Sequence, residues 1–257
     1  MFLKPFIQTI IYSLNNIKIT PEKLKLRFIG LSLYESLLLD DVQFVKTLIQ
    51  ELTSLVYKVP IIIILSYIIA IMLNSKFKGR GFFRSVFFLP VVITSSVVFT
   101  FLKTGATGNE TYVYKSLNIE NIMISLQMSD KLIGYFSGVI LTVFETIWNS
   151  GIQILIFLAG LQTVTASMYE AAKIEGCNAW DCFWKITFKI TTPILLINVL
   201  FTIIEQFRYA SMEVFLYYSS AMMYSYAAAS TTIYCVALFI VLGIVALLFS
   251  KAIYYRD

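Results

Sequence analysis

The chain has 257 residues, of which 58% are hydrophobic and only 14% charged, whereas a soluble domain is about a quarter charged. It contains no histidine, and its three cysteines show no metal-ligand spacing, which argues against a zinc site or a Cys–His nucleophile. The net charge of +5 comes from basic residues in short segments between apolar runs, a pattern typical of membrane surfaces rather than of nucleic-acid binding.

Apolar runs along the chain predict helices that cross a lipid bilayer, because about 20 helical residues span about 30 Å of hydrocarbon. Residues 1–14 are too few for a crossing, and we interpret them as the remnant of a first membrane helix. Residues 15–47 form a polar segment of mixed charge, which we place outside the cell. The five predicted full spans are residues 48–73, 82–102, 133–159, 190–207 and 227–250. The predicted fold class is therefore all-α, a polytopic helical membrane protein.

The distribution of basic residues does not by itself orient these spans. If the basic loop at residues 76–84 is cytoplasmic, the two sides of the membrane carry equal numbers of lysines and arginines. Long segments count less than short loops in the positive-inside rule, and the long 15–47 segment supplies much of the outer charge. That weighting favours a cytoplasmic 76–84 loop.

Residues 161–193, between the fourth and fifth predicted spans, are polar enough to lie outside the bilayer but have helical periodicity. Ser167 and Glu170 have the spacing of a capping box at the start of one helix. Gly176 is a natural stop for that helix, and Asn178 is a natural N-cap for the next. The segment is therefore predicted to form two short helices joined by a glycine turn.

The second of these short helices carries aromatic side chains that could anchor another protein. Four side chains are expected on one of its faces, with Ile186 and Ile190 alongside: Trp180, Phe183, Trp184 and Thr187. The small residues Ala171 and Ala172 on the first helix would let a partner approach the backbone. The alternative interpretation is that glutamate, alanine and lysine are simply good helix formers in a connector.

The order and spacing of this segment resemble the EAA loop of binding-protein-dependent ABC importer permeases. The matching positions are Glu170, Ala171, Ala172, Gly176, Phe183, Ile186 and Pro193. Residues 157–162 (FLAGLQ) and 79–90 (GRGFFRSVFFLP) resemble stretches of the carbohydrate-type permeases. The resemblance extends over roughly residues 48–257.

This resemblance implies the type I ABC importer transmembrane fold, with residues 48–257 as the permease core and residues 161–193 as a cytoplasmic coupling loop. In that family the loop inserts into a cleft on an ATPase subunit and transmits its closure to the membrane helices. The implied ATPase-coupling residues are Glu170, Ala171, Ala172, Gly176, Phe183 and Ile186. The implied location is the bacterial plasma membrane.

The partners implied are two ABC ATPase subunits, a second permease subunit, an extracellular solute-binding protein and the lipid bilayer. ATP and magnesium would bind to the ATPase subunits, because this sequence has no phosphate-binding G-x-x-x-x-G-K-[ST] motif. We therefore expect a transport subunit that is not itself an enzyme and that carries no catalytic residue, metal or cofactor.

The sequence departs from the family pattern at several positions. The family usually has aspartate at Glu175, alanine at Cys177 and proline at Lys189. Many sugar permeases also have a Gly-Gly-Pro loop before the last span, which residues 213–226 lack. The last departure weakens the sugar assignment more than the permease assignment.

Polar side chains inside the predicted spans could line a translocation path. Glu145, Asn149 and Gln153 follow a helical spacing of four, so they share one face of the fourth span. The candidate path residues are Glu145, Trp148, Asn149, Gln153, Glu205 and Gln206, with Trp148 and Tyr209 offering ring faces to a sugar. Intramembrane polar residues usually face a cavity or a partner helix, so hydrogen bonding between helices is the competing interpretation.

The function predicted from the sequence is a permease subunit of an ATP-driven ABC importer for a sugar or similar small polar solute. One alternative is an ABC permease for a non-sugar solute. Another is an ion-coupled secondary transporter with Glu145 and Glu205 as coupling groups, which predicts internal repeats that the sequence does not clearly show. A scaffold without transport would leave the loop pattern unexplained.

Overall fold

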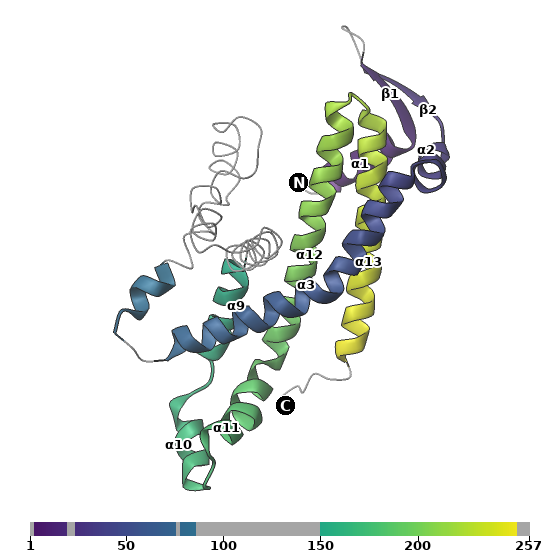
Figure 1. Ribbon diagram of the computed structural model, residues 1–257. Coiled ribbons are helices and arrows are strands. Elements are labelled where there is room, and N and C mark those ends of the chain that lie inside the picture. The colour runs from purple at the N-terminus through teal and green to yellow at the C-terminus, as the bar shows by residue number, and fades with distance from the viewer. Residues whose placement is uncertain (1–2, 20–23, 76–77, 86–149, 251–257) are drawn as a thin grey trace, which may run out of the picture. The chain divides into compact units, whose positions relative to one another are not determined.

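The computed structural model describes residues 3–19, 24–75, 78–85 and 150–250, most of which are helical (Figure 1). The chain forms two compact units. One unit comprises Met1–Ile61 and Leu196–Asp257, and the other comprises Ile62–Leu195. The long helices α3 (Val42–Asn74) and α12 (Lys189–Ser220) each contribute residues to both units.

Within the described residues, three helical stretches are long and apolar enough to cross a membrane. They are Val42–Asn74, Ala179–Ser220 and Tyr224–Phe249. A fourth crossing is possible if the bent pair Gly151–Leu161 and Ala166–Ile174 counts as one span. These helices agree with a multi-pass membrane protein, while the predicted total of five spans stays a prediction.

The predicted spans can be compared with the helices individually. The spans at 48–73 and 227–250 correspond to α3 and to α13 (Tyr224–Ser250). The predicted span at 190–207 lies within α12, which continues to Ser220. The spans at 82–102 and 133–159 lie mostly outside the described residues, which include only residues 82–85 and 150–159 of them.

Helix α13 shows the surface that a bilayer requires. Only 6% of its most hydrophobic window is buried inside the structure. Its exposed apolar side chains include Val236, Phe239, Ile240, Ile244, Leu247 and Leu248. In water these side chains would form a large exposed apolar patch, whereas in the hydrocarbon of a bilayer they contact lipid tails without a desolvation cost.

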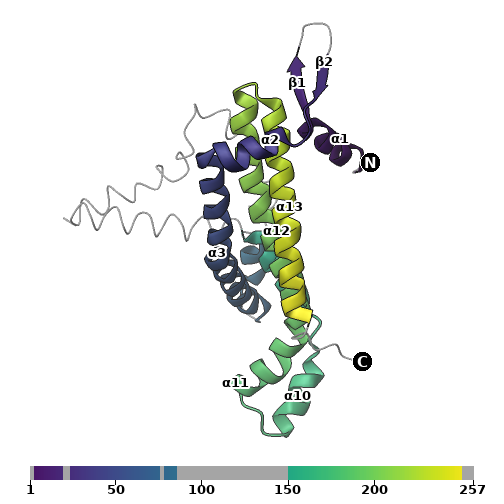
Figure 2. The same ribbon diagram turned by 90° about the vertical axis from the view of Figure 1, so that its right-hand side faces the viewer.

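A β-hairpin in the polar segment corrects the prediction that the fold is all-α. Strands β1 (Asn15–Ile19) and β2 (Leu24–Phe28) pair antiparallel, with Asn15 opposite Phe28 and Ile17 opposite Leu26 (Figure 2). The sequence carried the signal, because apolar and basic residues alternate through LKLRF with the period of a strand. The alternation covers only five residues, so it is a much weaker signal than the long apolar runs that predict helices.

Short elements attach this hairpin to the long helices of the same unit. Helix α1 (Leu3–Ser13) precedes it, and α2 (Ser32–Glu35) with the π-helix η1 (Ser36–Asp40) follows it. The backbone amide of Ile17 in β1 donates a 2.7 Å hydrogen bond to Ser225 Oγ at the start of α13. The hairpin is thereby tied to the turn between α12 and α13.

Asp41 joins the start of α3 to the end of α12. Its Oδ1 accepts a 2.9 Å hydrogen bond from the amide of Phe44, which caps the first turn of α3. Its Oδ2 accepts a 2.6 Å hydrogen bond from Tyr218 Oη on α12. The Tyr218 ring in turn stacks on Tyr226 of α13, with ring centroids 6.0 Å apart.

The core of this unit consists of packed aromatic rings and of small residues. The ring of Tyr234 on α13 meets Phe44 and Phe207 edge-on at 6.1 and 6.4 Å. The small residues 227–230 are all buried, with exposed fractions of 7% or less. Small residues buried in this way let helices pack closely.

Candidate functional site

The first helix of the predicted coupling loop is α10 (Ala166–Ile174), which follows α9 (Gly151–Leu161) at an angle of 59°. The predicted capping box is wrong. The helix begins before Ser167, with Thr165 as the N-cap residue, and Thr165 makes no side-chain capping hydrogen bond. Ser167 Oγ lies 3.0 Å from Thr165 Oγ1 instead, so the two hydroxyls pair with each other.

Gly176 ends α10 as the sequence predicted. Its φ of +84° lies in the left-handed region, which glycine adopts without steric cost. The amide of Gly176 donates to Lys173 O and the amide of Cys177 donates to Ala172 O, both at 3.0 Å. These two bonds form a Schellman motif and satisfy the last carbonyls of the helix.

The second helix of the loop begins at α11 (Ala179–Cys182) and continues as the π-helix η2 (Phe183–Phe188) into α12. Its predicted N-cap is confirmed, because Asn178 Oδ1 accepts a 2.8 Å hydrogen bond from the amide of Asp181. Figure 2 shows α10 and α11 lying side by side, as Figure 1 does from the other direction.

Three of the four side chains predicted to share one face of this helix are in mutual ring contact, with Phe183 6.3 Å from Trp180 and 5.1 Å from Trp184. Trp180 and Trp184 are exposed and in ring contact with each other, at 5.7 Å, whereas Thr187 is buried. Phe183 is half-buried. The π-helical turn changes the angular spacing of residues after Cys182, so the 3.6-residue period used for the prediction does not hold there.

The two helices together present an exposed apolar surface, which we call the α10–α11 surface. It consists of Ile174, Trp180 and Trp184, with exposed fractions of 89%, 68% and 44%. Of the predicted coupling residues, Glu170, Ala171 and Gly176 are also exposed on these elements. The others, Ala172, Phe183 and Ile186, are half-buried. An isoleucine and two tryptophans exposed this fully are the kind of anchor that a protein partner buries.

Tyr67 on α3 connects this loop to the membrane helices. Its ring contacts Phe157 of α9 at 4.9 Å, Phe183 of η2 at 6.2 Å and Phe188 of η2 at 6.4 Å. Its hydroxyl is 2.9 Å from Thr191 Oγ1 at the start of α12. One buried side chain of α3 therefore touches α9, η2 and α12, and sequence analysis did not single it out.

Two further contacts hold the same region together. Tyr169 Oη of α10 lies 2.6 Å from the buried Thr187 Oγ1 of η2, so the two loop helices are linked directly. Gly160 of α9 packs against Ile194 of α12 so closely that an added Cβ would approach Ile194 Cδ1 and, at 3.0 Å, Ile194 Cγ2. The glycine allows α9 and α12 to approach where a larger residue would separate them.

The charged groups of the loop lie in water. Lys185 Nζ and Asp181 Oδ1 form an ion pair at 3.4 Å, one helical turn apart, with side chains 71% and 39% exposed. Exposed pairs of this kind contribute little stability. In the sequence, Asp181 and Lys185 directly follow the exposed Trp180 and Trp184.

The predicted path residues are only partly described. Glu145, Trp148 and Asn149 lie outside the described residues, so the polar stripe on the fourth span stays a prediction. Gln153 on α9 is buried, with 1% of its surface exposed. On α12, Glu205 is paired with Arg208 at 3.8 Å, and Gln206 is half-buried. The Arg208 guanidinium lies 4.5 Å from the centre of the Tyr209 ring, so one face of that ring is already covered.

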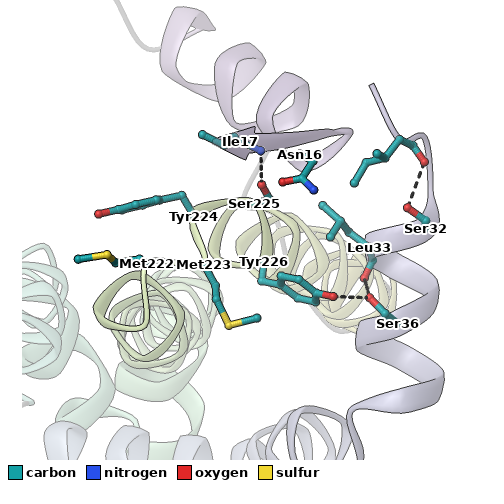
Figure 3. A pocket seen from close by; sticks show the side chains of 11 residues that line it. Asn16, Ile17, Ser32, Leu33, Ser36, Met222, Met223, Tyr224, Ser225 and Tyr226 are labelled. Carbon is teal, nitrogen blue, oxygen red and sulfur yellow. Dashed lines mark hydrogen bonds between the residues drawn. The ribbon is translucent and has the colours of Figure 1, made fainter. Parts of the chain in front are cut away.

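A cavity of about 470 Å³ lies between the hairpin, α2 and the turn joining α12 to α13 (Figure 3). Its wall carries hydroxyls and two methionines, and sequence analysis did not predict it. Tyr226 Oη accepts a 3.3 Å hydrogen bond from Ser36 Oγ, and Ser225 Oγ accepts one from the Ile17 amide. These bonds tie opposite walls of the cavity together.

Comparison of the sequence with known proteins finds relatives among the permease proteins of transport systems. The multiple sugar-binding transport system permease protein MsmF of Streptococcus mutans is 31% identical over 198 residues, which are 75% of this chain and 64% of that protein. The arabinooligosaccharides transport system permease protein AraP of Bacillus subtilis is 31% identical over 209 residues, 80% of this chain and 64% of that protein. The chain is a homologue of sugar ABC transporter permeases.

The structural comparison agrees with this relationship. A chain from the crystal structure of a bacterial ABC transporter involved in the import of the acidic polysaccharide alginate matches with a TM-score of 0.64. The match covers 98% of this permease homologue and 90% of that chain at 19% identity, which shows a shared fold. The permease homologue spans 58–64% of the length of the curated relatives it matches. No protein-family model matches it.

Proposed function

We propose that this chain is a membrane-spanning permease subunit of an ATP-driven ABC importer, which translocates a sugar or a similar small polar solute delivered by an extracellular solute-binding protein. In this proposal it works in a bacterial plasma membrane with a second permease subunit and two ATPase subunits. The ATPase subunits bind ATP and magnesium. The observation that carries the proposal is the α10–α11 surface, considered together with the sugar permease relatives.

The exposed residues of the loop support a role as the surface that the ATPase grips. Ile174 at the end of α10 and Trp180 at the start of α11 flank the Gly176 turn, and each exposes more than two thirds of its area. Burying an exposed apolar side chain contributes roughly 25 cal/mol per Å². A cleft on a partner that encloses this turn would therefore bind chiefly through these two side chains, with Glu170 and Ala171 facing it from α10.

The buried contacts of the loop support the transmission of movement. A displacement of α10 acts on η2 through the hydrogen bond between Tyr169 and Thr187. A displacement of η2 acts on α3 and α9 through the rings around Tyr67, and on α12 through the continuous helix. Packed aromatic rings at 5–6 Å transmit displacement because interiors are nearly incompressible.

The first test is capture of the ATPase subunit by the purified chain. Ile174→Ala removes most of the exposed side chain at the turn, and we expect ATPase capture and solute uptake to fall at least tenfold. Val56→Ala on α3 is the matched control, because Val56 is also an apolar side chain that is 76% exposed but lies on a membrane helix. Equal capture by both variants would contradict the proposed coupling surface.

The second test identifies the solute. Uptake is measured in cells lacking the gene, across monosaccharides, oligosaccharides, polyols and sugar phosphates, with the gene restored as a control. Loss of uptake of one sugar class supports the proposal, whereas loss confined to a non-sugar solute supports the alternative ABC permease. Uptake that follows an ion gradient and persists without ATP would support a secondary transporter instead.

The proposed path residues are tested on the same assay. Gln153→Leu keeps the size of the buried side chain and removes its hydrogen-bonding groups. If Gln153 contacts the solute, uptake falls while ATPase capture is unchanged. If it only joins helices, both fall together with the thermal stability of the chain.

A further inference from the structure

Two cysteines lie close together directly after the glycine turn of the loop. Cys177 follows Gly176, and Cys182 is the last residue of α11. Their sulfur atoms are only 2.7 Å apart, within 1 Å of a disulfide bond, whose length is about 2.05 Å. No function assigned above uses this pair.

The backbone holds both residues in place. The amide of Cys177 donates to Ala172 O at 3.0 Å as part of the Schellman motif, and the amide of Cys182 donates to Asn178 O at 2.9 Å. Asn178 is itself fixed by its capping bond to the amide of Asp181. Because the backbone of both cysteines is already held by hydrogen bonds, joining the two sulfur atoms requires a small adjustment of the side chains and no rearrangement of the backbone.

The two sulfurs differ in exposure. Cys182 is buried with 6% of its surface accessible, whereas Cys177 is half-buried and lies in the turn beside the exposed Gly176. A small oxidant can therefore reach Cys177 first, and Cys182 is in position to resolve the product. The third cysteine, Cys235, lies on α13 in the other unit.

We propose that Cys177 and Cys182 are a redox modification site that forms a reversible intramolecular disulfide. With hydrogen peroxide as the oxidant, one thiolate attacks an oxygen and breaks the O–O bond, which leaves a sulfenic acid and releases hydroxide that takes up a proton to become water. The second thiolate then attacks the sulfenic sulfur, forms the S–S bond and expels hydroxide, which takes up a proton to become a second water. Two thiols and one peroxide thus yield one disulfide and two waters. A dithiol reductant reverses the reaction.

Such a bond would act on the proposed coupling surface. It would fasten Cys177, the residue after Gly176, to the end of α11 and so restrain the start of the second loop helix, which carries the exposed Trp180. This consequence rests on the proposed function, whereas formation of the bond does not. In a reducing cytoplasm the bond would be transient and would mark periods of oxidant exposure.

The pKa of the Cys177 thiol predicts how the reaction depends on pH. The hydrogen bond with Cys182, burial and the nearby charge of Asp181 raise this pKa, and Lys185 lowers it slightly, so that it lies at about 11. Because the thiolate is the attacking form, the rate of oxidation should rise about tenfold per pH unit between pH 7 and pH 9. The reaction is therefore slow at neutral pH and requires sustained exposure to the oxidant.

The experiment uses the full chain carrying C235S, purified in detergent and treated with hydrogen peroxide. Alkylation with a maleimide-polyethylene glycol should then label two thiols before treatment and none after it, and the intact mass should fall by that of two hydrogens. Treatment with a dithiol should restore both labels. C177S and C182S in the same background are the matched controls, and each should gain oxygen atoms instead of losing hydrogens.

A comparison with the unfolded chain shows whether the fold brings the thiols together. In glutathione buffers, the folded C235S chain should reach half-oxidation at a ratio of reduced to oxidised glutathione at least tenfold more reducing than the same chain in urea. An equal midpoint would overturn the proposal. Two labels after peroxide treatment, added oxygen, or dimers joined between chains would also overturn it. These readouts do not involve transport, so their failure leaves the proposed permease function standing, and failure of ATPase capture leaves the disulfide standing.

Discussion

Two helix ends in this protein have the same hydrogen-bond pattern but different residues at the critical position. Gly176 after α10 and Met222 after α12 both have positive φ, at 84° and 59°. Both turns are Schellman motifs, because the amide of Cys177 reaches Ala172 O and the amide of Met223 reaches Tyr218 O, at 3.0 and 2.9 Å. A left-handed conformation costs a non-glycine residue about 1–2 kcal/mol.

The difference shows how each turn is maintained. At Gly176 the local sequence favours the turn, so the loop can hold its shape while its surface is exposed. At Met222 surrounding contacts impose the turn, through Asp41 on Tyr218, the stacking of Tyr226 and the bond from Ile17 to Ser225. The first turn is self-sufficient, and the second depends on its neighbours.

The largest expected effect is at Asp41, on which the second turn depends. Asp41→Ala removes the cap of α3 and the acceptor for Tyr218, which should destabilise the chain by about 2–4 kcal/mol. Thermal unfolding in detergent, followed by size-exclusion chromatography, measures the loss. Asp41→Asn keeps one acceptor oxygen for the Phe44 amide, and its NH2 group can donate to Tyr218 Oη instead of accepting from it, so it should lose less than half as much. A normal melting temperature for Asp41→Ala would contradict the dependence of this turn on its neighbours.

The next effect is at Gly176, where Ala at the same φ should strain the turn by about 1–2 kcal/mol. Nothing lies within 4 Å of an added Cβ, so backbone strain is the only cost. Gly176→Ala should weaken ATPase capture about five- to thirtyfold, because strain in the gripped state reduces the competent population. Gly176→Asn tolerates the left-handed region better and should retain more binding. Equal affinities for all three proteins would show that the turn is not gripped.

The third prediction has the opposite sign. Met222→Gly should stabilise the chain by about 1 kcal/mol, because it relieves the left-handed strain and the Met222 side chain is 80% exposed. Met222→Ala removes the same side-chain atoms beyond Cβ but keeps the strain. A rise in melting temperature for the glycine variant alone would confirm the contrast between the turns. Equal shifts would attribute the effect to the side chain.

The smallest effect compares single hydroxyls in the two regions. Tyr67→Phe keeps the ring packing and removes the buried 2.9 Å contact with Thr191, which should cost about 0.5–1.5 kcal/mol. Tyr226→Phe removes the longer 3.3 Å bond from Ser36 and should cost less. Melting curves of the two variants, measured in the same detergent, give the order. The reverse order would place the more important hydroxyl at the α12–α13 end.

Local features of the loop could be predicted because their causes are local. Gly176 ends a helix through its own conformational freedom, and Asn178 caps the next through a bond that spans three residues. The predicted start of α10 was wrong because Ser167 and Glu170 have the spacing of a capping box, whereas the N-cap residue is Thr165, which makes no side-chain capping bond. The pairing of residues 15–19 with 24–28 is a contact between two short strands, and the five-residue alternation in LKLRF is a weak signal for it.

The sequence by itself determined the membrane class, since hydropathy sums over neighbouring residues and needs no knowledge of the fold. It also determined where the loop helices break. Only the tertiary structure decided that Thr187 is buried while Trp184 stays exposed, and that Tyr67 joins α3 to α9 and η2. Those outcomes depend on a π-helical register and on contacts between distant segments, which no local period encodes.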